Sequence, residues 1–241
     1  MVDLLPEGFK RFGAELCANF LAQLPISGIS VSAFPGHAPE TTICASNDTS
    51  ARIDELQFDL GEGPRWEALQ TRRPVMLPNV KTHAHSAWPV FAKAVLAYDV
   101  EAIFVFPLQL GAMDVGVIEL YSSTPGSLSP ADHSLALQLS DAAAWQLLRH
   151  ILTVDPSDTS GAGEPSEGKD REKSPLSRRE VHQATGMVLA QAGTSATDAL
   201  LLLRAHAFSQ GRSVRDVARD VVSRKLDFTR PRGDDVSTSV E

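Results

Sequence analysis

Residues 102–121, AIFVFPLQLGAMDVGVIELY, contain the two strongest strand signals in the chain. The segments 102–110 and 115–121 are rich in β-branched and aromatic side chains, which are typical of strands. The Gly-Ala-Met-Asp sequence at 111–114 lies between them and predicts a hairpin-like connection. We therefore expect two neighbouring antiparallel strands in this part of the chain.

Further strands and helices are predicted on both sides of this hairpin. Apolar residues spaced by three and four indicate helices, whereas alternation with period two indicates strands. Strands are expected at 26–34, 41–45 and 74–77, and helices at 9–24, 54–60, 66–69 and 88–96. After the hairpin, Ser129 and Pro130 predict the N-cap and first residue of a helix that continues to Leu152. Its expected apolar face is Leu135, Leu139, Ala142, Trp145 and Leu148. This order indicates an α+β domain with an antiparallel sheet and helices on one side.

The 241 residues are enough for one large domain or two small ones. Residues 155–174 read DPSDTSGAGEPSEGKDREKS, and such a polar segment cannot bury enough surface to offset its ordering entropy. We therefore predict two domains, 8–153 and 175–228, joined by a flexible linker at 154–174. Residues 229–241 are polar and acidic, and we expect them to form a disordered tail.

The formal net charge of −8 would, for a single uniform domain, argue against a nucleic-acid partner. The charge is unevenly divided, because residues 1–153 carry −7 and residues 154–174 carry −3. Residues 175–232 carry 10 basic and 5 acidic residues, a net charge of +5, and the tail from 233 carries −3. A basic segment in an otherwise acidic chain favours a nucleic-acid-binding module at the C-terminal end.

Several classes of protein are disfavoured by composition. No apolar run approaches the roughly 18 residues of a membrane-spanning helix, and the first residues do not resemble a signal peptide. We expect no membrane association and a cytoplasmic location. Two cysteines, Cys17 and Cys44, are too few for a disulfide framework or a four-cysteine zinc site, and we expect both to be buried, inert thiols.

No catalytic residue, cofactor or metal site is predicted. The glycines at 61 and 63 lack the spacing of a phosphate-binding loop, and the nucleophile pattern G-x-S-x-G is absent. His83 and His85 are expected to lie in a solvated loop, because no further metal ligand accompanies them. An apolar ligand pocket is left open, with Trp66, Trp88, Phe104 and Phe106 as candidate walls. The alternative for each of the four is an ordinary core aromatic.

Residues 8–152 resemble a GAF domain. The resemblance rests on Gln57 to Pro64, on PVMLPNV at 74–80, and on the closing hairpin before a long helix. GAF domains are sensory modules that bind small ligands and often form dimers, so the resemblance implies a homodimer and a small-molecule ligand of unidentified chemistry. The cyclic-nucleotide signature of some GAF domains is not recognisable here.

Residues 175–228 are predicted to form three short helices. Ser174 and Pro175 are placed at the start of the first helix, which Gly193 ends. Thr194 or Ser195 caps the second helix, with its apolar side at Ala196, Ala199, Leu200, Leu203, Ala207 and Phe208, and Gly211 ends it. Ser213 caps the third helix, whose apolar residues follow the full amphipathic pattern.

This segment resembles an ANTAR RNA-binding domain. The matching elements are Arg178 with Val181, then Ala184-Thr185-Gly186-Met187, Ala199-x3-Leu203-Arg204, and Arg212-x-Val214-x2-Val217-Ala218. Thr185 departs from the family, which often has Lys at this position. ANTAR domains bind hairpin RNA in leader transcripts and favour antitermination, so the resemblance implies hairpin RNA as a partner.

Candidate RNA-binding residues are cationic or polar side chains on these helices. They are Arg178, Arg179, His182, Thr185, Arg204, Arg212, Arg215 and Arg219. The last three fall on one face of the third helix, where guanidinium groups can bridge phosphates or stack on unpaired bases. The alternative is a solvated face with local ion pairs such as Arg212–Asp216.

The leading hypothesis is a signal-responsive, RNA-binding antitermination regulator that acts by binding and not by catalysis. A DNA-binding regulator of the helix-turn-helix kind is an alternative, because three short helices also describe that module. A GAF-fold thiol reductase and a sensory adaptor without a nucleic-acid role are two further alternatives.

Overall fold

The computed structural model describes residues 7–34, 40–82, 87–153 and 178–229. The chain divides into two compact units, Met1–Arg178 and Arg179–Glu241. Four of the sequence predictions lie outside the described residues. They are the linker at 154–174, the helix start at Ser174 and Pro175, the pair His83 and His85, and residues 230–241 of the tail.

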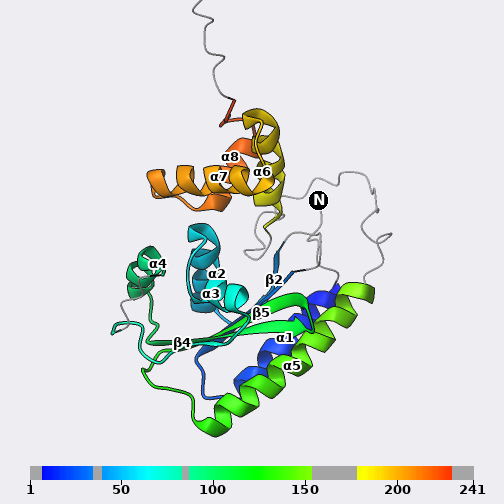
Figure 1. The fold of residues 1–241 in the computed structure, drawn as a ribbon, viewed down its shortest axis with the longest axis vertical. Helices are drawn as coiled ribbons and strands as arrows, with labels where there is room; N and C mark the ends of the chain where they lie inside the picture. The colour runs from blue at the N-terminus through cyan, green and yellow to red at the C-terminus, as the bar shows by residue number, and fades with distance from the viewer. Residues whose placement is uncertain (1–6, 35–39, 83–86, 154–177, 230–241) are drawn as a thin grey trace, which may run out of the picture. The chain divides into compact units, whose positions relative to one another are not determined.

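The first unit is built on a five-stranded antiparallel sheet (Figure 1). The strands are β1 (Gly28–Ala33), β2 (Thr41–Ala45), β3 (Val75–Leu77), β4 (Ala102–Leu110) and β5 (Met113–Ser122). Their spatial order is β2-β1-β5-β4-β3, and every neighbouring pair is antiparallel. The structure confirms the α+β class and the five strands that the sequence predicts.

The β4–β5 hairpin is tighter than the sequence predicts. Leu110 pairs with Met113, so Gly111 and Ala112 alone form the turn. Gly111 has φ +61, in the left-handed region that two-residue hairpins require and that glycine adopts without steric cost. Met113 and Asp114, predicted to lie in the connection, are the first two residues of β5.

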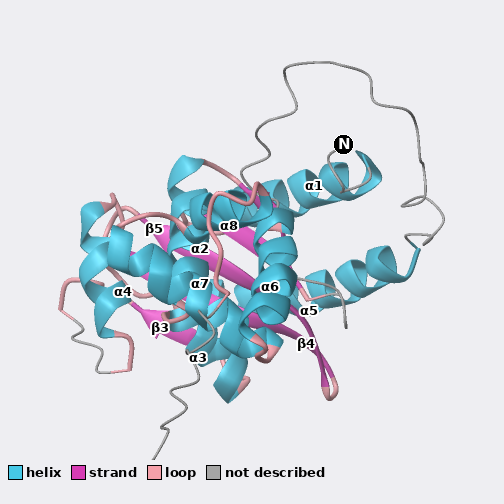
Figure 2. Ribbon diagram, turned by 90° about the horizontal axis from the view of Figure 1, so that it is seen from above, coloured by secondary structure: helices cyan, strands magenta, loops and turns pink. Residues whose placement is uncertain are grey.

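Helices cover both faces of this sheet (Figures 1 and 2). They are α1 (Glu7–Gln23), α2 (Asp48–Leu60), α3 (Pro64–Thr71), α4 (Pro89–Ala94), the 3₁₀ turn η1 (Val95–Ala97) and α5 (Pro130–Thr153). Helices α1 and α5 pack on one face, and α2 to α4 pack on the other. The expectation of helices on one side is therefore wrong. All six residues of β1 are buried, as a strand between two covered faces requires.

Alternate residues of β4 separate the two halves of the core. Phe104 and Phe106 pack with α1 and α5, whereas Ile103 and Val105 pack with α2 to α4. This division follows from the two-residue period of a strand, which points successive side chains to opposite faces.

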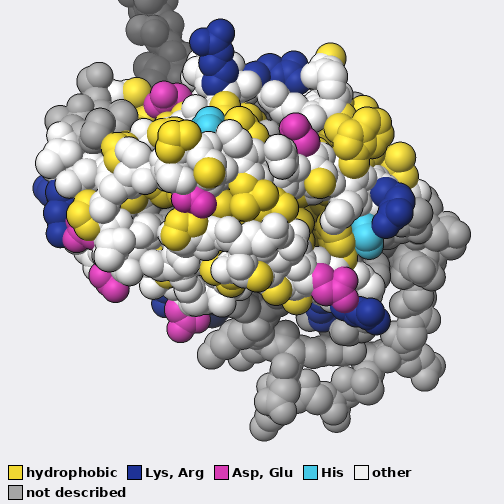
Figure 3. Space-filling model, turned by 90° about the horizontal axis from the view of Figure 1, so that it is seen from below, with side chains coloured by type: hydrophobic (Ala, Val, Ile, Leu, Met, Phe, Trp, Pro, Cys, Tyr) yellow, Lys and Arg dark blue, Asp and Glu magenta, His cyan; other side chains and the backbone are white. Residues whose placement is uncertain are grey.

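Helix α5 is rotated relative to its predicted apolar face, although Leu135, Leu139 and Leu148 of that face are half-buried and pack against the core. Its buried residues are Ala136, Ser140, Ala143, Ala144 and Leu147. Trp145 is 66% exposed, although the helical pattern placed it in the core. The small alanines, which allow α5 to approach the sheet closely, carry a weaker apolar signal than the tryptophan. Figure 3 shows hydrophobic side chains on the outer surface of this side of the molecule.

Helix α2 begins six residues earlier than predicted. Asn47 caps it, because its side chain accepts a hydrogen bond from the Ser50 backbone N–H while Ser50 Oγ accepts one from the Asn47 N–H. This reciprocal capping box satisfies two donors that a helix start leaves free.

A disulfide joins Cys17 of α1 to Cys44 of β2, with an S–S distance of 2.06 Å. Both side chains are buried, as predicted, but the prediction of two free thiols is wrong. The two residues are 27 positions apart in the chain, and only the packing of α1 against β2 brings them together.

The second unit contains α6 (Arg179–Ala192), α7 (Ala196–Gln210) and α8 (Val214–Val222). Ser195 and Ser213 cap α7 and α8 by accepting hydrogen bonds from the backbone N–H groups of Asp198 and Asp216. Gly193 and Gly211 follow α6 and α7 with φ +61. The structure confirms the three predicted helices, but Phe208 is 65% exposed and does not join their core. That core consists of Val181, Ala184, Val188, Ala199, Leu203, Ala207, Val214, Val217, Ala218 and Val221.

Across the described parts of the chain, no single helix is long and apolar enough to cross a membrane. Helices α6 and α7 satisfy the length and composition test only together, as a pair bent by 104°.

Candidate functional site

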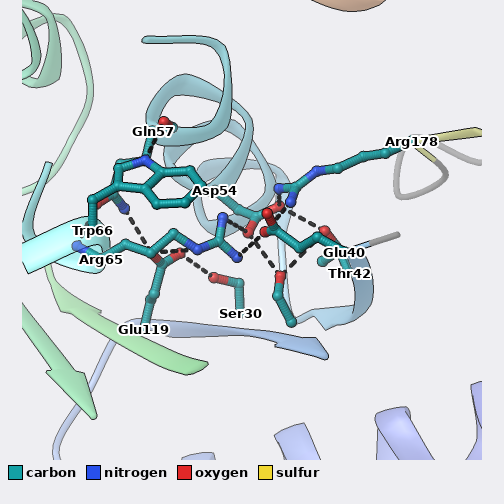
Figure 4. A network of polar contacts seen from close by, with 10 residues as sticks. Ser30, Glu40, Thr42, Asp54, Gln57, Arg65, Trp66, Glu119 and Arg178 are labelled. Carbon is teal, nitrogen blue, oxygen red and sulfur yellow. Dashed lines mark hydrogen bonds and ion pairs between the residues drawn. The ribbon is translucent and has the colours of Figure 1, made fainter. Parts of the chain in front are cut away.

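A buried cluster of charged side chains lies between the sheet and helices α2 and α3 of the first unit (Figure 4). Arg65 of α3 is at its centre with a fully buried side chain. Its Nη2 is 2.9 Å from Glu40 Oε1, its Nη1 is 2.9 Å from Asp54 Oδ1, and its Nε is 3.6 Å from Glu119 Oε1. One guanidinium thus joins the residue before β2, helix α2 and strand β5.

The turn between α2 and α3 determines where Arg65 lies. Gly61 ends α2 in the left-handed conformation, and Gly63 precedes α3 with φ +130. A Cβ at Gly63 would come within 2.6 Å of the Gln57 side chain, so only glycine fits there. Gln57 Oε1 in turn accepts a hydrogen bond of 2.9 Å from the Arg65 backbone N–H. The glycines of Gly-Glu-Gly-Pro therefore help to position Arg65.

Polar side chains of the sheet and of α2 hold the carboxylates. Asp54 accepts hydrogen bonds from Thr42 at 2.8 Å and from Ser32 at 3.1 Å. Glu119 accepts hydrogen bonds from Gln57 at 2.7 Å and from Ser30 at 3.0 Å. These bonds supply the partners that buried carboxylates need. The alternation of Ser30 and Ser32 with apolar neighbours on β1 is the one sequence signal that points to this polar face.

Arg178, the last residue of the first unit, also belongs to this cluster (Figure 4). Its Nη2 donates to Asp54 Oδ2 at 2.8 Å, and its Nη1 donates to Glu40 Oε1. Its guanidinium carbon lies 3.9 Å from the centre of the Phe58 ring, and the residue is only 8% exposed. The sequence placed Arg178 among the RNA-binding residues, but in this conformation carboxylates of the first unit hold its guanidinium.

The ionisation of the cluster reflects burial and these partners. Burial alone would raise the pKa of Asp54, but Arg178, Arg65 and the hydrogen bonds from Thr42 and Ser32 together lower it. Burial raises the pKa of Glu119 to about 7, against the opposing charge of Arg65. The three carboxylates outweigh the effect of burial on Arg65 and raise its pKa above the ordinary value. The cluster therefore favours the charged form of Asp54.

The four aromatic residues proposed as pocket walls do not form one pocket. Phe104 and Phe106 lie in the core on the α1 and α5 side of the sheet. Trp88 lies in the core on the opposite side, and Trp66 of α3 donates its indole N–H to the Gln57 carbonyl oxygen at 2.7 Å. Because residues 104 and 106 share one strand face, they cannot reach the face on which the tryptophans lie.

Arg215 and Arg219 lie on α8, as predicted, whereas Arg212 lies just before its N-cap Ser213 and not on the helix. All three arginines have carboxylate neighbours within the second unit. Arg212 pairs with Asp220 at 2.7 Å, and Arg219 pairs with Asp216 at 3.1 Å. Arg215 Nε is 3.9 Å from Glu180 of α6. The predicted Arg212–Asp216 pair is therefore replaced by the Arg212–Asp220 pair, whose members are eight residues apart.

The remaining candidates lie on α6 and α7. Arg179 is exposed, whereas His182, Thr185 and Arg204 are half-buried. The hydroxyl of Thr185 donates to the Val181 carbonyl oxygen at 2.7 Å, as a threonine inside a helix commonly does. Within the described ranges, no group of three or more histidine, cysteine or acidic residues is arranged to hold a metal ion.

Two protein families match this chain. The GAF domain model matches residues 7–147, and the ANTAR domain model matches residues 172–222. No curated protein matches it.

Among solved structures, a GAF domain of a two-component sensor histidine kinase from Bacillus halodurans is 14% identical, covers 61% of this chain and 97% of its own, and gives a TM-score of 0.44. A GAF domain/HD domain protein from Geobacter sulfurreducens is 14% identical, covers 60% of this chain and 94% of its own, and gives a TM-score of 0.45. A type II free methionine-R-sulfoxide reductase from Thermoplasma acidophilum is 14% identical, covers 59% of this chain and 94% of its own, and gives a TM-score of 0.45.

Proposed function

This chain belongs to the GAF domain family and also carries an ANTAR domain, and from that pairing we propose a signal-responsive regulator that binds hairpin RNA in leader transcripts and favours antitermination. The presence of both domains in one chain is the observation that carries the proposal. The proposed organisation keeps a sensory domain at 8–153, a linker at 154–174, the RNA-binding domain at 175–228 and a tail at 229–241.

RNA is proposed to contact cationic and polar side chains on α6, α7 and α8, together with Arg212 just before α8. The proposed contacts are Arg179, His182, Thr185, Arg204, Arg212, Arg215 and Arg219, with Arg178 joining them only when it leaves the first unit. The net charge of +5 on residues 175–232 supports an electrostatic attraction to phosphate. Thr185 contributes no charge, so its proposed contact is the weakest of the set.

The carboxylate partners of these arginines do not oppose the proposal. Arg212 and Arg219 have side chains that are 37% and 52% exposed. Surface ion pairs of this kind contribute roughly 0–1 kcal/mol, because water screens them. A phosphate can therefore replace Asp220 or Asp216 at small cost, and its bidentate geometry suits a guanidinium.

A homodimer is proposed to form through α1 and α5. Trp145 and Leu152 of α5 are 66% and 75% exposed, and Leu137 of α5 and Leu21 of α1 are each 37% exposed. Trp145 and Leu152 are seven residues apart, the spacing at which two helices meet along a seam. Large apolar side chains gathered on one face favour a protein partner over exposure to water.

We propose that the protein acts by binding and not by catalysis. The alternative of a thiol reductase gains one observation, because the two cysteines do form a pair. That pair is buried on the α1 side of the sheet, opposite the charged cluster, and an inaccessible thiol is a poor nucleophile. The proposed target, a transcript, places the protein in the cytoplasm.

Fluorescence anisotropy with the full-length protein tests the RNA proposal. A labelled two-hairpin RNA, its unpaired linear counterpart and a duplex DNA of equal length should be titrated at two salt concentrations. We expect the hairpin RNA to bind at least tenfold more tightly than the other two at both concentrations. Equal binding of duplex DNA would favour the helix-turn-helix alternative and contradict the proposal.

A further inference from the structure

Arg178 occupies the charged cluster in the manner of a ligand. It lies outside every helix and strand, and it is 124 residues from Asp54 and 138 residues from Glu40 in the chain. Two carboxylates and the ring of Phe58 surround its guanidinium, leaving it 8% exposed. We refer to Glu40, Asp54 and Phe58 as the guanidinium cradle.

The charges of the cluster require a cation in the cradle. Arg65 is held by all three carboxylates, Glu40, Asp54 and Glu119. When Arg178 leaves, Arg65 is the one remaining cation among them in the described part of the chain. Three buried carboxylates then face a single guanidinium, and buried negative charge that is not fully compensated is unfavourable. The position that Arg178 vacates therefore accepts a positive group and disfavours neutral or anionic molecules.

The geometry of the cradle selects a planar cation. The two carboxylate oxygens come from different elements, Asp54 in α2 and Glu40 before β2, and they meet different nitrogens of one guanidinium. The Phe58 ring lies 3.9 Å from the guanidinium carbon, at stacking distance. A planar group with several fixed N–H donors satisfies all three contacts, whereas a compact ammonium group does not present donors in a flat fork.

Arg65 is not the exchangeable cation of the cluster. Its side chain is fully buried, and its own backbone N–H is bonded to Gln57 at the start of α3. Arg178, at the end of the first unit, is instead held by contacts of its guanidinium with Glu40, Asp54 and Phe58.

We propose that the guanidinium cradle is the signal-binding site of the GAF domain and that its ligand is a small organic cation with a guanidinium group, which displaces Arg178. This inference rests on the proposed function, because it names the class of signal that the GAF domain senses. Arg178 directly precedes Arg179, the first residue of α6, so displacement frees the chain at the start of that helix. The ligand and Arg178 compete for one site, and each weakens the binding of the other.

Methylguanidinium is the probe that tests this inference. Two control compounds accompany it: N-methylurea, a neutral molecule of similar shape, and methylammonium, a compact cation. Full-length wild type and Arg178→Ala should be titrated by calorimetry. Removal of Arg178 leaves a vacant, negatively charged cradle, so we expect Arg178→Ala to bind methylguanidinium at least tenfold more tightly than wild type does. It should also prefer methylguanidinium over both control compounds by at least tenfold.

A second substitution locates the binding. Asp54→Asn added to Arg178→Ala should reduce methylguanidinium affinity at least tenfold, whereas Asp48→Asn, also in α2 but absent from the cluster contacts, should leave it unchanged. Equal binding of methylguanidinium and N-methylurea by Arg178→Ala would overturn the inference. If Arg178→Ala does not fold, the Nε–H nuclear magnetic resonance signal of Arg178 in wild type decides the matter. Methylguanidinium must shift it toward the solvent-exposed position, and an unchanged signal at saturation overturns the inference.

Neither readout contains RNA, so the two proposals fail separately. Hairpin binding without methylguanidinium binding overturns the ligand inference alone. Methylguanidinium binding without hairpin binding overturns the RNA proposal alone.

Discussion

Gln57 and Glu119, which are 62 residues apart in the chain, are joined by a 2.7 Å hydrogen bond from the Gln57 amide to the Glu119 carboxylate. The bond links α2 to β5 and lies beside Arg65. Gln57 also accepts a hydrogen bond from the Arg65 backbone N–H. One amide therefore orients both a buried acid and a buried base, and the stability of the first unit should depend on the charge of each.

Glu119→Gln should remove a pH dependence of folding. The pKa of Glu119 is raised from 4.5 to about 7, so the folded state binds a proton more tightly than the unfolded state does. Its contribution is fully present below pH 4.5 and is lost as the pH rises through 7, at most about 3 kcal/mol in all. Asp54, with a lowered pKa, titrates below this window.

Urea unfolding at pH 5 and at pH 8 measures the effect of Glu119. The wild type should lose free energy of unfolding between these values, and Glu119→Gln should lose much less. The groups facing Glu119 are Arg65, Asp54, Ser30, Gln57 and Arg178. An equal pH dependence in both proteins would show that Glu119 does not titrate here.

Arg65→Met should destabilise the first unit by about 3–5 kcal/mol, because it leaves buried carboxylates without their central cation. Arg52→Met is the matched control. Arg52 is on α2, its side chain is 68% exposed, and its nearest carboxylate, on Glu55, is 3.9 Å away. Its loss should cost less than about 0.5 kcal/mol. Chemical denaturation of both variants at pH 7 provides the comparison, and similar losses would contradict a structural role for the cluster.

Removal of the disulfide should lower the free energy of unfolding by about 3.5 kcal/mol, the chain-entropy value for a 27-residue loop. Cys17→Ala with Cys44→Ala tests this, compared with oxidised wild type by urea unfolding. Mass spectrometry of the unfolded, unreduced protein should show no alkylation by iodoacetamide. Two alkylated cysteines would mean that the thiols are free.

Trp145→Glu with Leu152→Glu should convert a dimer to a monomer, because it places two charges on the exposed apolar face of α5. Leu96→Glu is the control, since Leu96 is 49% exposed but lies in η1, on the other side of the sheet. Sedimentation velocity distinguishes the two states. A double variant that remains dimeric would exclude this face as the interface.

Arg215→Ala with Arg219→Ala should weaken hairpin binding and flatten its salt dependence by about one to two units, at roughly 0.7–0.9 for each lost phosphate contact. Arg72→Ala with Arg73→Ala removes the same charge from the first unit and should leave the slope unchanged. The comparison requires affinities at four or more salt concentrations. Equal slopes in the two double variants would show that α8 does not meet phosphate.

Features with local causes could be predicted from the sequence. The β4–β5 hairpin follows from apolar strands around a glycine turn. The helix caps are also local, because a cap needs only the next three residues, so the sequence predicts Ser213 and narrows the other cap to Thr194 or Ser195, of which the structure shows Ser195. The rotation of α5 was missed because Trp145 dominates an apolar pattern, although small alanines are what the sheet accepts.

The charged cluster could not be predicted because its members are brought together only by the fold. Asp54 reads as an ordinary helix residue, and Arg65 falls between the Gly-Glu-Gly-Pro break and the helix predicted at 66–69. Arg178 lies within the stretch that resembles the RNA-binding domain. The disulfide has the same cause, since α1 and β2 meet only when the sheet forms. Long-range pairings of this kind leave no periodicity in a single sequence.

The three tryptophans lie in three different surroundings. Trp145 is exposed on α5, Trp88 is buried in the core, and Trp66 is hydrogen-bonded to Gln57 beside the charged cluster. The chain therefore carries its own optical probes. Quenching by iodide reports first on Trp145 and hence on assembly, the emission maximum of Trp88 reports unfolding, and changes at Trp66 report exchange of the cation in the cradle without any added dye.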